Sequence, residues 1–590
     1  MAALCASQPA VSAATDAVAA PTAPRPLEQF FDNTAISDDF ATGAADLDGA
    51  GNSISAQDLM AAGWHPGQRL TLDGAGHEWP RYGDGAPDNV RTDGQTVKLQ
   101  GRGNAVSFLV AASTEGAAGS AATGTGTIHY RDGSTGSYTL TAPDWRSGPH
   151  ATKAVGLPHL NTPGGQLAEK TRLYAVTVPV RRGAMIDAVT LPADPGPTTD
   201  LHVFAASVRP EADGWTGSWG AAASGYPAVG PWTDRTLRLV VHTSAGGTAA
   251  RIRLANTFAA APVTVGGATV ALRADGASAA TVPQPVTFDG GRPSAVMPAG
   301  AQAVSDPVGF DVPAGADLLV SFHLPGTVVS APVHSLALQT SYVSAPGSGD
   351  RSGDQGGENF TGQIRTWPFL TGVDVSGGPG SVVTLGDSIT DGTATTPDTN
   401  RRWPDVLARR LRERPGAPVY GVLNQGISAN RVASDRYQGD GVSTDLGGVS
   451  AQNRLERDVL SQTGVRTVLV FEGVNDVRWG YSAADVIDGL RRIAERAHSR
   501  GLRVVAATIL PCAGERMCTA EADAQREAVN AFIRDNGGVF DAVADFDAVA
   551  RDPQRPQALL PAYDSGDHLH PNETGLTALA ESVDLGTLVP

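Results

Sequence analysis

A serine at the end of a strand-like apolar run is the residue of this chain best suited to act as a nucleophile. In SVVTLGDSITDG the run 381–385 leads directly into Gly-Asp-Ser, which ends at Ser388. A serine hydroxyl attacks an acyl carbon only when a base removes its proton, so this chemistry needs a histidine within hydrogen-bond reach. The stretch DHLHP offers His568 and His570, and Asp567 precedes His570 by three residues. An aspartate there can bind the second ring nitrogen of His570 and fix its tautomer.

The order of segments after Pro379 predicts the sheet that would position these residues. Five strand-like runs alternate with five helical patterns, and Ser482 with Asp485 resembles a capping box at the start of one helix. Such alternation is typical of a parallel sheet that helices cover on both faces, with ligands bound beyond the carboxyl ends of its strands. The strand-like runs are 381–385, 418–423, 466–473, 502–510 and 538–546, and the helical patterns are 403–414, 450–462, 482–499, 520–535 and 573–583.

Four polar clusters fall at those carboxyl ends or in the loops beyond them. They are Gly-Asp-Ser at 386–388, LNQGISANR at 423–431, EGVND at 472–476 and DHLHP at 567–571. In combination and in this order, they resemble the four blocks of the SGNH hydrolase family, also called GDSL esterases and lipases. The resemblance covers 377–590, about a third of the chain. It implies a flavodoxin-like α/β/α fold with a five-stranded parallel sheet, and a serine ester hydrolase.

The resemblance also implies the catalytic roles. Ser388 would attack the ester, His570 would act as its base, and Asp567 would orient His570. His570 is preferred to His568 because only His570 has an aspartate at the family's spacing of three. Asp387 is expected to shape the loop rather than to act as an acid or a base.

The oxyanion of the tetrahedral intermediate needs donors fixed in advance. By resemblance these are the backbone N–H groups of Ser388 and Gly426 and the side-chain amide of Asn475. Glycine at 426 would let the backbone approach the substrate closely. The sequence departs from the family pattern at Ala429, which stands where a second glycine is common, so the shape of this loop is open.

Each cluster taken alone also has a structural interpretation. Ser388 would then be a helix N-cap, Gly426 a bend, Asn475 part of a turn, and the histidine stretch a solvated loop. The joint occurrence of all four clusters in order favours the catalytic interpretation. No G-x-S-x-G sequence surrounds Ser388, which disfavours the α/β-hydrolase family.

The composition predicts globular, loop-rich and β-heavy domains. The 590 residues are 41% hydrophobic and 18% charged and include 70 Gly and 40 Pro, in a chain too long for one ordinary domain. The formal net charge is −17, and Lys and Arg are not concentrated in any stretch, which argues against a nucleic-acid partner. No apolar run approaches the roughly 20 residues of a membrane span, so we expect none.

Changes in pattern along the chain predict its domains. The hairpin pattern around Asp132-Gly133 and similar alternating runs predict strands throughout the first two thirds. The first β region resembles galactose-binding-like sandwiches, and the second resembles the jelly-roll modules of some carbohydrate esterases. Trp64, Trp79 and Trp145 are candidates to stack on sugars, with a place in the core as the alternative. The expected units are a leader remnant or disordered linker at 1–26, a β-sandwich at 27–210, a β jelly-roll at 211–376 and the catalytic domain at 377–590.

Two further features bear on compartment and metal binding. Cys512 and Cys518 are close enough in PCAGERMC to form a disulfide, with two free thiols as the alternative. A disulfide and the Ala-, Ser- and Pro-rich start favour secretion. Asp46, Asp48 and Asn52 resemble a structural calcium loop, although a polar turn is the alternative because the acidic twelfth position of an EF-hand is missing.

Together these observations predict a secreted serine esterase that needs no cofactor for catalysis. It would hydrolyse short-chain esters, and the expected substrate is an acetylated polysaccharide. A lipase or general carboxylesterase acting on lipid or aryl esters is the enzymatic alternative. A carbohydrate-binding protein with an inactive hydrolase domain is the alternative of another class.

Overall fold

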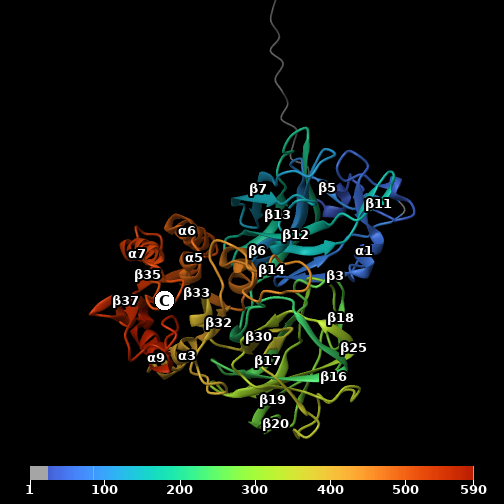
Figure 1. Cartoon of the computed structure of the whole chain (residues 1–590). Coiled ribbons are helices and arrows are strands. Elements are labelled where there is room, and N and C mark those ends of the chain that lie inside the picture. The colour runs from blue at the N-terminus through green and yellow to red at the C-terminus, as the bar shows by residue number, and fades with distance from the viewer. Residues whose placement is uncertain (1–23, 84, 589–590) are drawn as a thin grey trace, which may run out of the picture.

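The computed structural model describes residues 24–83 and 85–588. Most of the expected leader segment, 1–26, lies outside the described residues. In Figure 1 the blue and cyan strands of the first β region pack above the green and yellow strands of the second. The orange and red α/β region lies beside both.

The first β region is a sandwich built around one long strand, β6 (Thr96–Thr114). The first part of β6 pairs with β13 (Met185–Thr190), and the second part pairs with β12 (Thr171–Pro179) and β14 (Thr199–Pro210). The predicted hairpin is confirmed: β7 and β8 pair antiparallel around Asp132-Gly133. Other strands of this region are β1 (Ile36–Ser37), β2 (Ser53–Ser55), β3 (Arg69–Leu72), β4 (Ala75–Glu78), β5 (Val90–Arg91), β7 (Ala122–Tyr130), β8 (Thr135–Ala142), β9 (Lys153–Leu157), β10 (Leu160–Thr162) and β11 (Gly165–Leu167), with the short helix α1 (Ala56–Ala61).

The three tryptophans expected as sugar-stacking candidates lie in the core of this region. Trp64, Trp79 and Trp145 are all 0% exposed. The rings of Trp64 and Trp79 meet edge to face at 5.0 Å, and Phe204 stacks on Trp79. Burial of large aromatic rings is a main source of core stability. The sugar-stacking hypothesis is therefore wrong for these three residues, and the core alternative is correct.

The second β region consists of two sheets that face each other. The inward side chains of β16 (Ala228–His242) and β25 (Asp317–Ser330) pack against those of β17 (Gly247–Ala255) and β30 (Leu370–Ser376) in one hydrophobic core. This is the packing of a β-sandwich. Other strands of this region are β15 (Trp215–Gly220), β18 (Val263–Val265), β19 (Ala268–Asp275), β20 (Ser278–Ala279), β21 (Gln284–Val286), β22 (Ala295–Met297), β23 (Gln302–Val304), β24 (Val308–Val312), β26 (Val333–His334), β27 (Ser341–Val343), β28 (Gly362–Ile364) and β29 (Trp367–Pro368).

The C-terminal region contains the predicted five-stranded parallel sheet. Its strand order is β32-β31-β33-β34-β35, so the first strand in the chain lies inside the sheet and the next two strands flank it. This is the flavodoxin-like order, whose ligands bind where the chain leaves the first strand. The strands are β31 (Ser381–Gly386), β32 (Gly421–Gly426), β33 (Val465–Phe471), β34 (Arg503–Ala507) and β35 (Ala542–Ala544), with a small separate pair, β36 (Arg551–Asp552) and β37 (Arg555–Leu559).

Helices cover both faces of this sheet. Alternating strand residues point to opposite sides. Val382 packs with α3 (Trp403–Glu413) and α9 (Glu573–Ser582). Val383 packs with α4 (Ala451–Leu455), α6 (Ala483–Ser499) and α7 (Ala520–Asp535). The predicted capping box of Ser482 and Asp485 opens α6. The helices are α2 (Ser388–Asp391), α3 (Trp403–Glu413), α4 (Ala451–Leu455) continued by a π-helical turn (Glu456–Leu460), α5 (Val474–Arg478), α6 (Ala483–Ser499), α7 (Ala520–Asp535), α8 (Phe546–Ala550), α9 (Glu573–Ser582) and α10 (Leu585–Leu588).

Both β regions contact the α/β region through buried polar groups. On β32, the edge strand of the parallel sheet, the Val422 N–H donates to Ser244 Oγ of the second β region at 2.9 Å. Arg209 of the first β region forms an ion pair with Glu456 at 2.5 Å. The edge of the sheet is thereby covered rather than left free to pair with another chain.

Candidate active site

Ser388 lies where the first strand of the parallel sheet ends and α2 begins. Asp387 is the N-cap of α2, and its carboxylate accepts the Ile389 N–H at 2.9 Å. This cap holds the turn that directs Ser388 out of the sheet. The Ser388 Oγ lies 2.8 Å from His570 Nε2.

The second ring nitrogen of His570 is held by Asp567. The distance from His570 Nδ1 to Asp567 Oδ2 is 2.6 Å, and Asp567 Oδ1 accepts the backbone N–H groups of Leu569 and His570. Partial burial opposes ionisation of Asp567, but the hydrogen bonds from His570 and the backbone outweigh it and lower the pKa of Asp567 to about 2. An ionised Asp567 requires the proton on Nδ1, which leaves Nε2 free to accept from the serine.

His568, the rival base, points elsewhere. Its Nδ1 lies 2.6 Å from Asp564 Oδ2, and its side chain is 53% exposed. Its backbone has a φ of 63°, so the chain turns sharply between the two histidines. The structure thus brings Ser388, His570 and Asp567 together and keeps His568 in a separate pair.

The expected backbone donors of the oxyanion hole differ in their surroundings. No acceptor for the Ser388 N–H occurs within 24–83 and 85–588. The Gly426 N–H, in contrast, donates to Asn424 Oδ1 at 2.9 Å. Three residues later, Ala429 has a φ of 64°, and its N–H has no acceptor among the described residues. Ala429 therefore offers a free donor in the same loop as Gly426, the donor expected from the sequence.

Glycine at 426 also has a packing role that the sequence did not indicate. A Cβ at this position would collide with the backbone of Thr390 and Asp391 in α2. Glycine is therefore required for β32 to approach α2, and its expected approach to a substrate stays a prediction.

Both polar atoms of the Asn475 side-chain amide form hydrogen bonds. Its Nδ2 donates to the Asn430 carbonyl oxygen at 3.0 Å, and its Oδ1 accepts from Arg478 at 3.1 Å. The next residue, Asp476, accepts the backbone N–H groups of Val432 and Ala433. Asn475 and Asp476 therefore tie α5 to the loop that carries Ala429.

Asp387, Glu472 and Asp476 form a group of buried acids that no sequence pattern indicated. Burial raises the pKa of Asp387 to about 7 and that of Asp476 to about 6. Burial also raises the pKa of Glu472, whose nearest cation is Arg454 at 3.7 Å. Neither carboxyl oxygen of Glu472 has a hydrogen-bond partner among the described residues. A neutral carboxyl is thus favoured at these positions at mildly acidic pH.

A histidine from the second β region also reaches α2. His334 Nε2 lies 3.0 Å from Asp391 Oδ1, and Asp391 Oδ2 accepts the Ser428 N–H at 3.0 Å. Ser428 directly precedes Ala429, so this buried pair connects the β region to the same loop. No signal in the sequence links His334 to the site, because 57 residues separate it from Asp391 and the contact exists only after folding.

The candidate calcium loop has internal contacts. Asp46 accepts the Gly51 N–H at 2.9 Å, and Asp48 accepts the side-chain amide of Asn52 at 2.8 Å. These contacts suit a polar turn, and the calcium interpretation stays a prediction. Over the described part of the chain, no group of three or more His, Cys, Asp or Glu residues is arranged to hold a metal ion.

Cys512 and Cys518 form a disulfide, as the spacing suggested. Among the described helices, none combines the length and apolar character needed to cross a bilayer.

Two known protein families match this chain, one in its N-terminal third and one in its C-terminal third. The GDSL-like lipase/acylhydrolase family matches residues 384–578, and the AziU2-like β-sandwich domain family matches residues 23–212. No curated protein matches the chain.

Similar solved structures cover the C-terminal third. A proposed lipolytic protein of the G-D-S-L family from Desulfitobacterium hafniense is 22% identical, with 34% of this chain and 96% of that chain covered and a TM-score of 0.27. A GDSL-like lipase from Bacteroides thetaiotaomicron is 19% identical, with 35% and 87% covered and a TM-score of 0.26. An acetyl xylan esterase is also 19% identical, with 34% and 96% covered and a TM-score of 0.26.

The family match covers the strand of Ser388, the loop of Ala429, the helix of Asn475 and the loop of His570. The match of residues 23–212 to the AziU2-like β-sandwich domain family confirms that the predicted β-sandwich lies ahead of it. The C-terminal third of this chain is a hydrolase domain of the GDSL-like lipase/acylhydrolase family.

Proposed function

We propose that the protein is an extracellular serine esterase that removes short acyl groups, namely acetyl groups, from a polysaccharide. The observation that carries the esterase mechanism is the hydrogen-bonded series Ser388, His570 and Asp567, with distances of 2.8 and 2.6 Å. The buried acids near the site and His334 take no part in this series.

The mechanism follows from the direction of these hydrogen bonds. His570 Nε2 removes the Ser388 proton as Oγ attacks the ester carbonyl carbon, and Asp567 stabilises the imidazolium that forms. The tetrahedral intermediate collapses when His570 gives its proton to the departing alcohol oxygen. His570 then removes a proton from a water molecule, which attacks the carbonyl carbon of the acyl-enzyme. Collapse of this second intermediate releases the carboxylic acid, and His570 returns the proton to Ser388 Oγ.

The oxyanion would bind the Ser388 N–H, the Asn475 amide and a backbone N–H of the loop 426–429. The free N–H of Ala429 favours this residue as the third donor, because the Gly426 N–H already has an acceptor. Donors held in place before the reaction need no reorganisation in the transition state, which is why their loss typically lowers the rate by about 100-fold or more.

An aromatic residue beside the site supports a carbohydrate ester rather than a long-chain lipid. Trp479 lies four residues after Asn475 and is 38% exposed. The guanidinium groups of Arg431 and Arg436 lie 4.6 and 4.8 Å from its ring centroid. These guanidinium groups can donate hydrogen bonds to sugar hydroxyl groups, and their charge makes the rim a poor surface for an alkyl chain.

The extracellular location is supported by the Cys512–Cys518 disulfide. Disulfides persist in oxidising compartments and are rare in the reducing cytosol.

The esterase proposal is tested by the hydrolysis of p-nitrophenyl acetate. We expect the purified protein to turn over and the Ser388→Ala variant to lose at least about 1,000-fold in kcat. Equal rates for the two proteins would refute the proposal and favour a binding protein with an inactive domain.

The substrate class is tested by a chain-length series of p-nitrophenyl esters together with acetylated xylan. We expect a preference for acetyl esters, and Trp479→Ala should raise KM for acetylated xylan at least about 5-fold without changing KM for p-nitrophenyl acetate. Phe40→Ala, at an aromatic residue 95% exposed in the first β region, is the matched control. A preference for long acyl chains would instead indicate a lipase.

A further inference from the structure

The disulfide loop 512–518 fixes the backbone of Glu515. The Glu515 N–H donates to the Cys512 carbonyl oxygen at 3.1 Å, and the Cys518 N–H donates to the Glu515 carbonyl oxygen at 3.0 Å. The disulfide joins the two ends of this loop. Glu515 is therefore tied by its backbone to both cysteines, and its side chain leaves the loop in a fixed direction.

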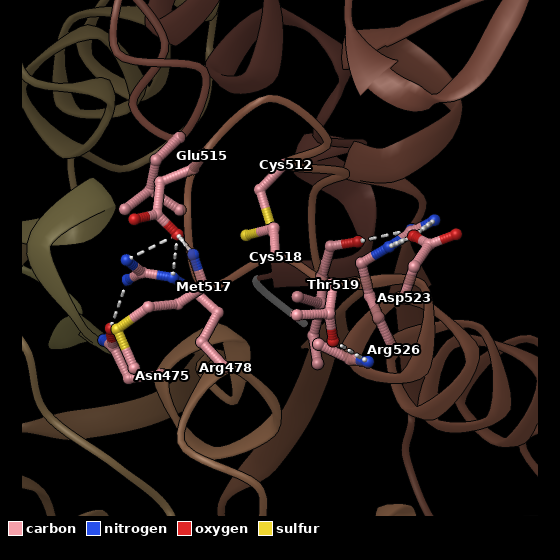
Figure 2. Close-up of a disulfide and its surroundings, with 12 residues drawn as sticks. Asn475, Arg478, Cys512, Glu515, Met517, Cys518, Thr519, Asp523 and Arg526 are labelled. Atoms are coloured by element: carbon pink, nitrogen blue, oxygen red, sulfur yellow. Dashed lines mark hydrogen bonds and ion pairs between the residues drawn. A yellow bond between two sulfur atoms is a disulfide. The ribbon is translucent and has the colours of Figure 1, made fainter.

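That side chain reaches Arg478, as Figure 2 shows. Glu515 Oε2 accepts from Arg478 Nε at 3.0 Å and lies 2.9 Å from Nη2 of the same guanidinium. The same oxygen also accepts the Met517 N–H at 2.8 Å. The Arg478 side chain is only 9% exposed, so water screens this pair weakly. Two of the three guanidinium nitrogens are thus committed to Glu515.

The remaining nitrogen of Arg478 determines the orientation of the Asn475 amide. Nη1 donates to Asn475 Oδ1 at 3.1 Å, and a guanidinium can only donate. On the other side, Asn475 Nδ2 donates to the Asn430 carbonyl oxygen. Rotating the amide by half a turn would place donor against donor and acceptor against acceptor. The second Nδ2 hydrogen consequently stays available for an oxyanion.

The same loop also contacts the histidine loop. Gly514 packs so closely on the imidazole of His568 that a Cβ at 514 would clash with the ring. Loop 512–518 therefore lies between α5, which carries Asn475, and the loop that carries Asp567 and His570.

We propose that Glu515, presented by the Cys512–Cys518 loop, is a positioning residue that holds the oxyanion-binding amide of Asn475 through Arg478. The inference rests on the proposed function, in which Asn475 stabilises the transition state. Glu515 touches no reacting atom, and its effect passes entirely through the orientation of one amide.

The test is a double-mutant cycle between Glu515→Gln and Asn475→Ala with p-nitrophenyl acetate. Glu515→Gln keeps the shape of the side chain and removes its charge. We expect kcat to fall about 10-fold with KM within about 2-fold, because an oxyanion contact acts mainly in the transition state. In the Asn475→Ala background, Glu515→Gln should cause no further loss. Glu515→Asp, which keeps the charge, should recover part of kcat.

The matched control lies on the other side of the same disulfide. Asp523 accepts from Arg526 Nε at 2.8 Å, as Figure 2 also shows, but this pair makes no contact with Asn475. Asp523→Asn should leave kcat unchanged. Circular dichroism and the melting temperature of each variant verify that it folds.

The outcomes separate this inference from the proposed function. An unchanged kcat in Glu515→Gln overturns the inference. So does a double variant whose fold-loss in kcat equals the product of the losses in Glu515→Gln and Asn475→Ala. Either result leaves the role of Ser388 intact. Full activity of Ser388→Ala would overturn the proposed function and this inference together.

Discussion

Replacing His334 by leucine should weaken the contact between the second β region and the hydrolase domain. It should also loosen the loop that carries Ala429. His334 Nδ1 lies 2.9 Å from the Ala222 carbonyl oxygen, and Nε2 lies 3.0 Å from Asp391 Oδ1. Both neighbours are acceptors, so the imidazolium form of His334, which carries hydrogen on both ring nitrogens, satisfies both contacts. Leucine would leave the carboxylate of Asp391 buried without this partner.

The expected loss can be worked from the burial of the pair. The side chains of His334 and Asp391 are 5% and 2% exposed. Removing one partner of a buried pair costs about 3–5 kcal/mol. For a cooperative unit of about 200 residues, the lower value corresponds to a fall of roughly 6–12 °C in the melting temperature. Since Asp391 also holds the Ser428 N–H, kcat should fall as well.

The stability that His334 contributes should fall as the pH rises. Burial and the nearby Arg402 lower the pKa of His334, but the charge and hydrogen bond of Asp391 and the hydrogen bond to Ala222 outweigh them, so the net shift is upward from 6.5. A raised pKa stabilises the folded state fully below the unfolded value, and this contribution is lost as the pH rises through the folded value. The stability difference between wild type and His334→Leu should therefore be largest near pH 6 and smaller at pH 9.

Urea unfolding at pH 6 and pH 9, together with kcat for p-nitrophenyl acetate, measures these effects. His77→Leu is the matched control, because His77 is buried in the first β region with a pKa lowered by burial to about 3. The control should lose stability without loss of kcat. Equal stability and kcat of His334→Leu and wild type at pH 6, or a difference that grows with pH, would refute the reasoning.

Three further substitutions test other parts of the site. Asp387→Asn should stabilise the protein by roughly 2–4 kcal/mol at pH 8, and by less at pH 5, in urea unfolding. Burial raises the pKa of Asp387 to about 7, so the folded wild-type protein is penalised as the pH rises from the unfolded pKa toward 7. A larger gain at pH 5 than at pH 8 would contradict this. Asp567→Asn should lower kcat by about 1,000-fold or more through the wrong tautomer of His570, and an unchanged kcat would exclude the orienting role. Ala429→Gly should raise stability by up to about 1 kcal/mol in thermal unfolding while activity is kept, since alanine is strained at a φ of 64°, and a loss of stability would show that this strain is absent.

The strongly periodic parts of the fold could be predicted from sequence. Strands and helices of the hydrolase domain alternate with clear apolar patterns, and Ser482 with Asp485 marks one helix start, as the structure confirms. These signals are local, so they survive without knowledge of the tertiary contacts. The positions of Ser388 and the histidine stretch at the carboxyl side of the sheet follow from the same pattern.

The parts that could not be predicted depend on contacts between distant residues. Composition does not distinguish a buried Trp64 from an exposed one, because both suit an aromatic ring. A family motif names Gly426 as a donor, but only the folded chain shows that Asn424 occupies its N–H. The contacts of His334 with Asp391 and of Glu515 with Arg478 likewise join segments that are separate in sequence.

Covalent labelling with a fluorophosphonate tests the central claim most directly. Such a reagent loses fluoride when an activated serine attacks its phosphorus, and peptide mass spectrometry then locates the adduct. We predict one phosphonyl group per chain on Ser388, complete loss of esterase activity, and labelling at least about 100-fold slower in His570→Ala. An adduct on another serine, or full activity with Ser388 modified, would contradict the account.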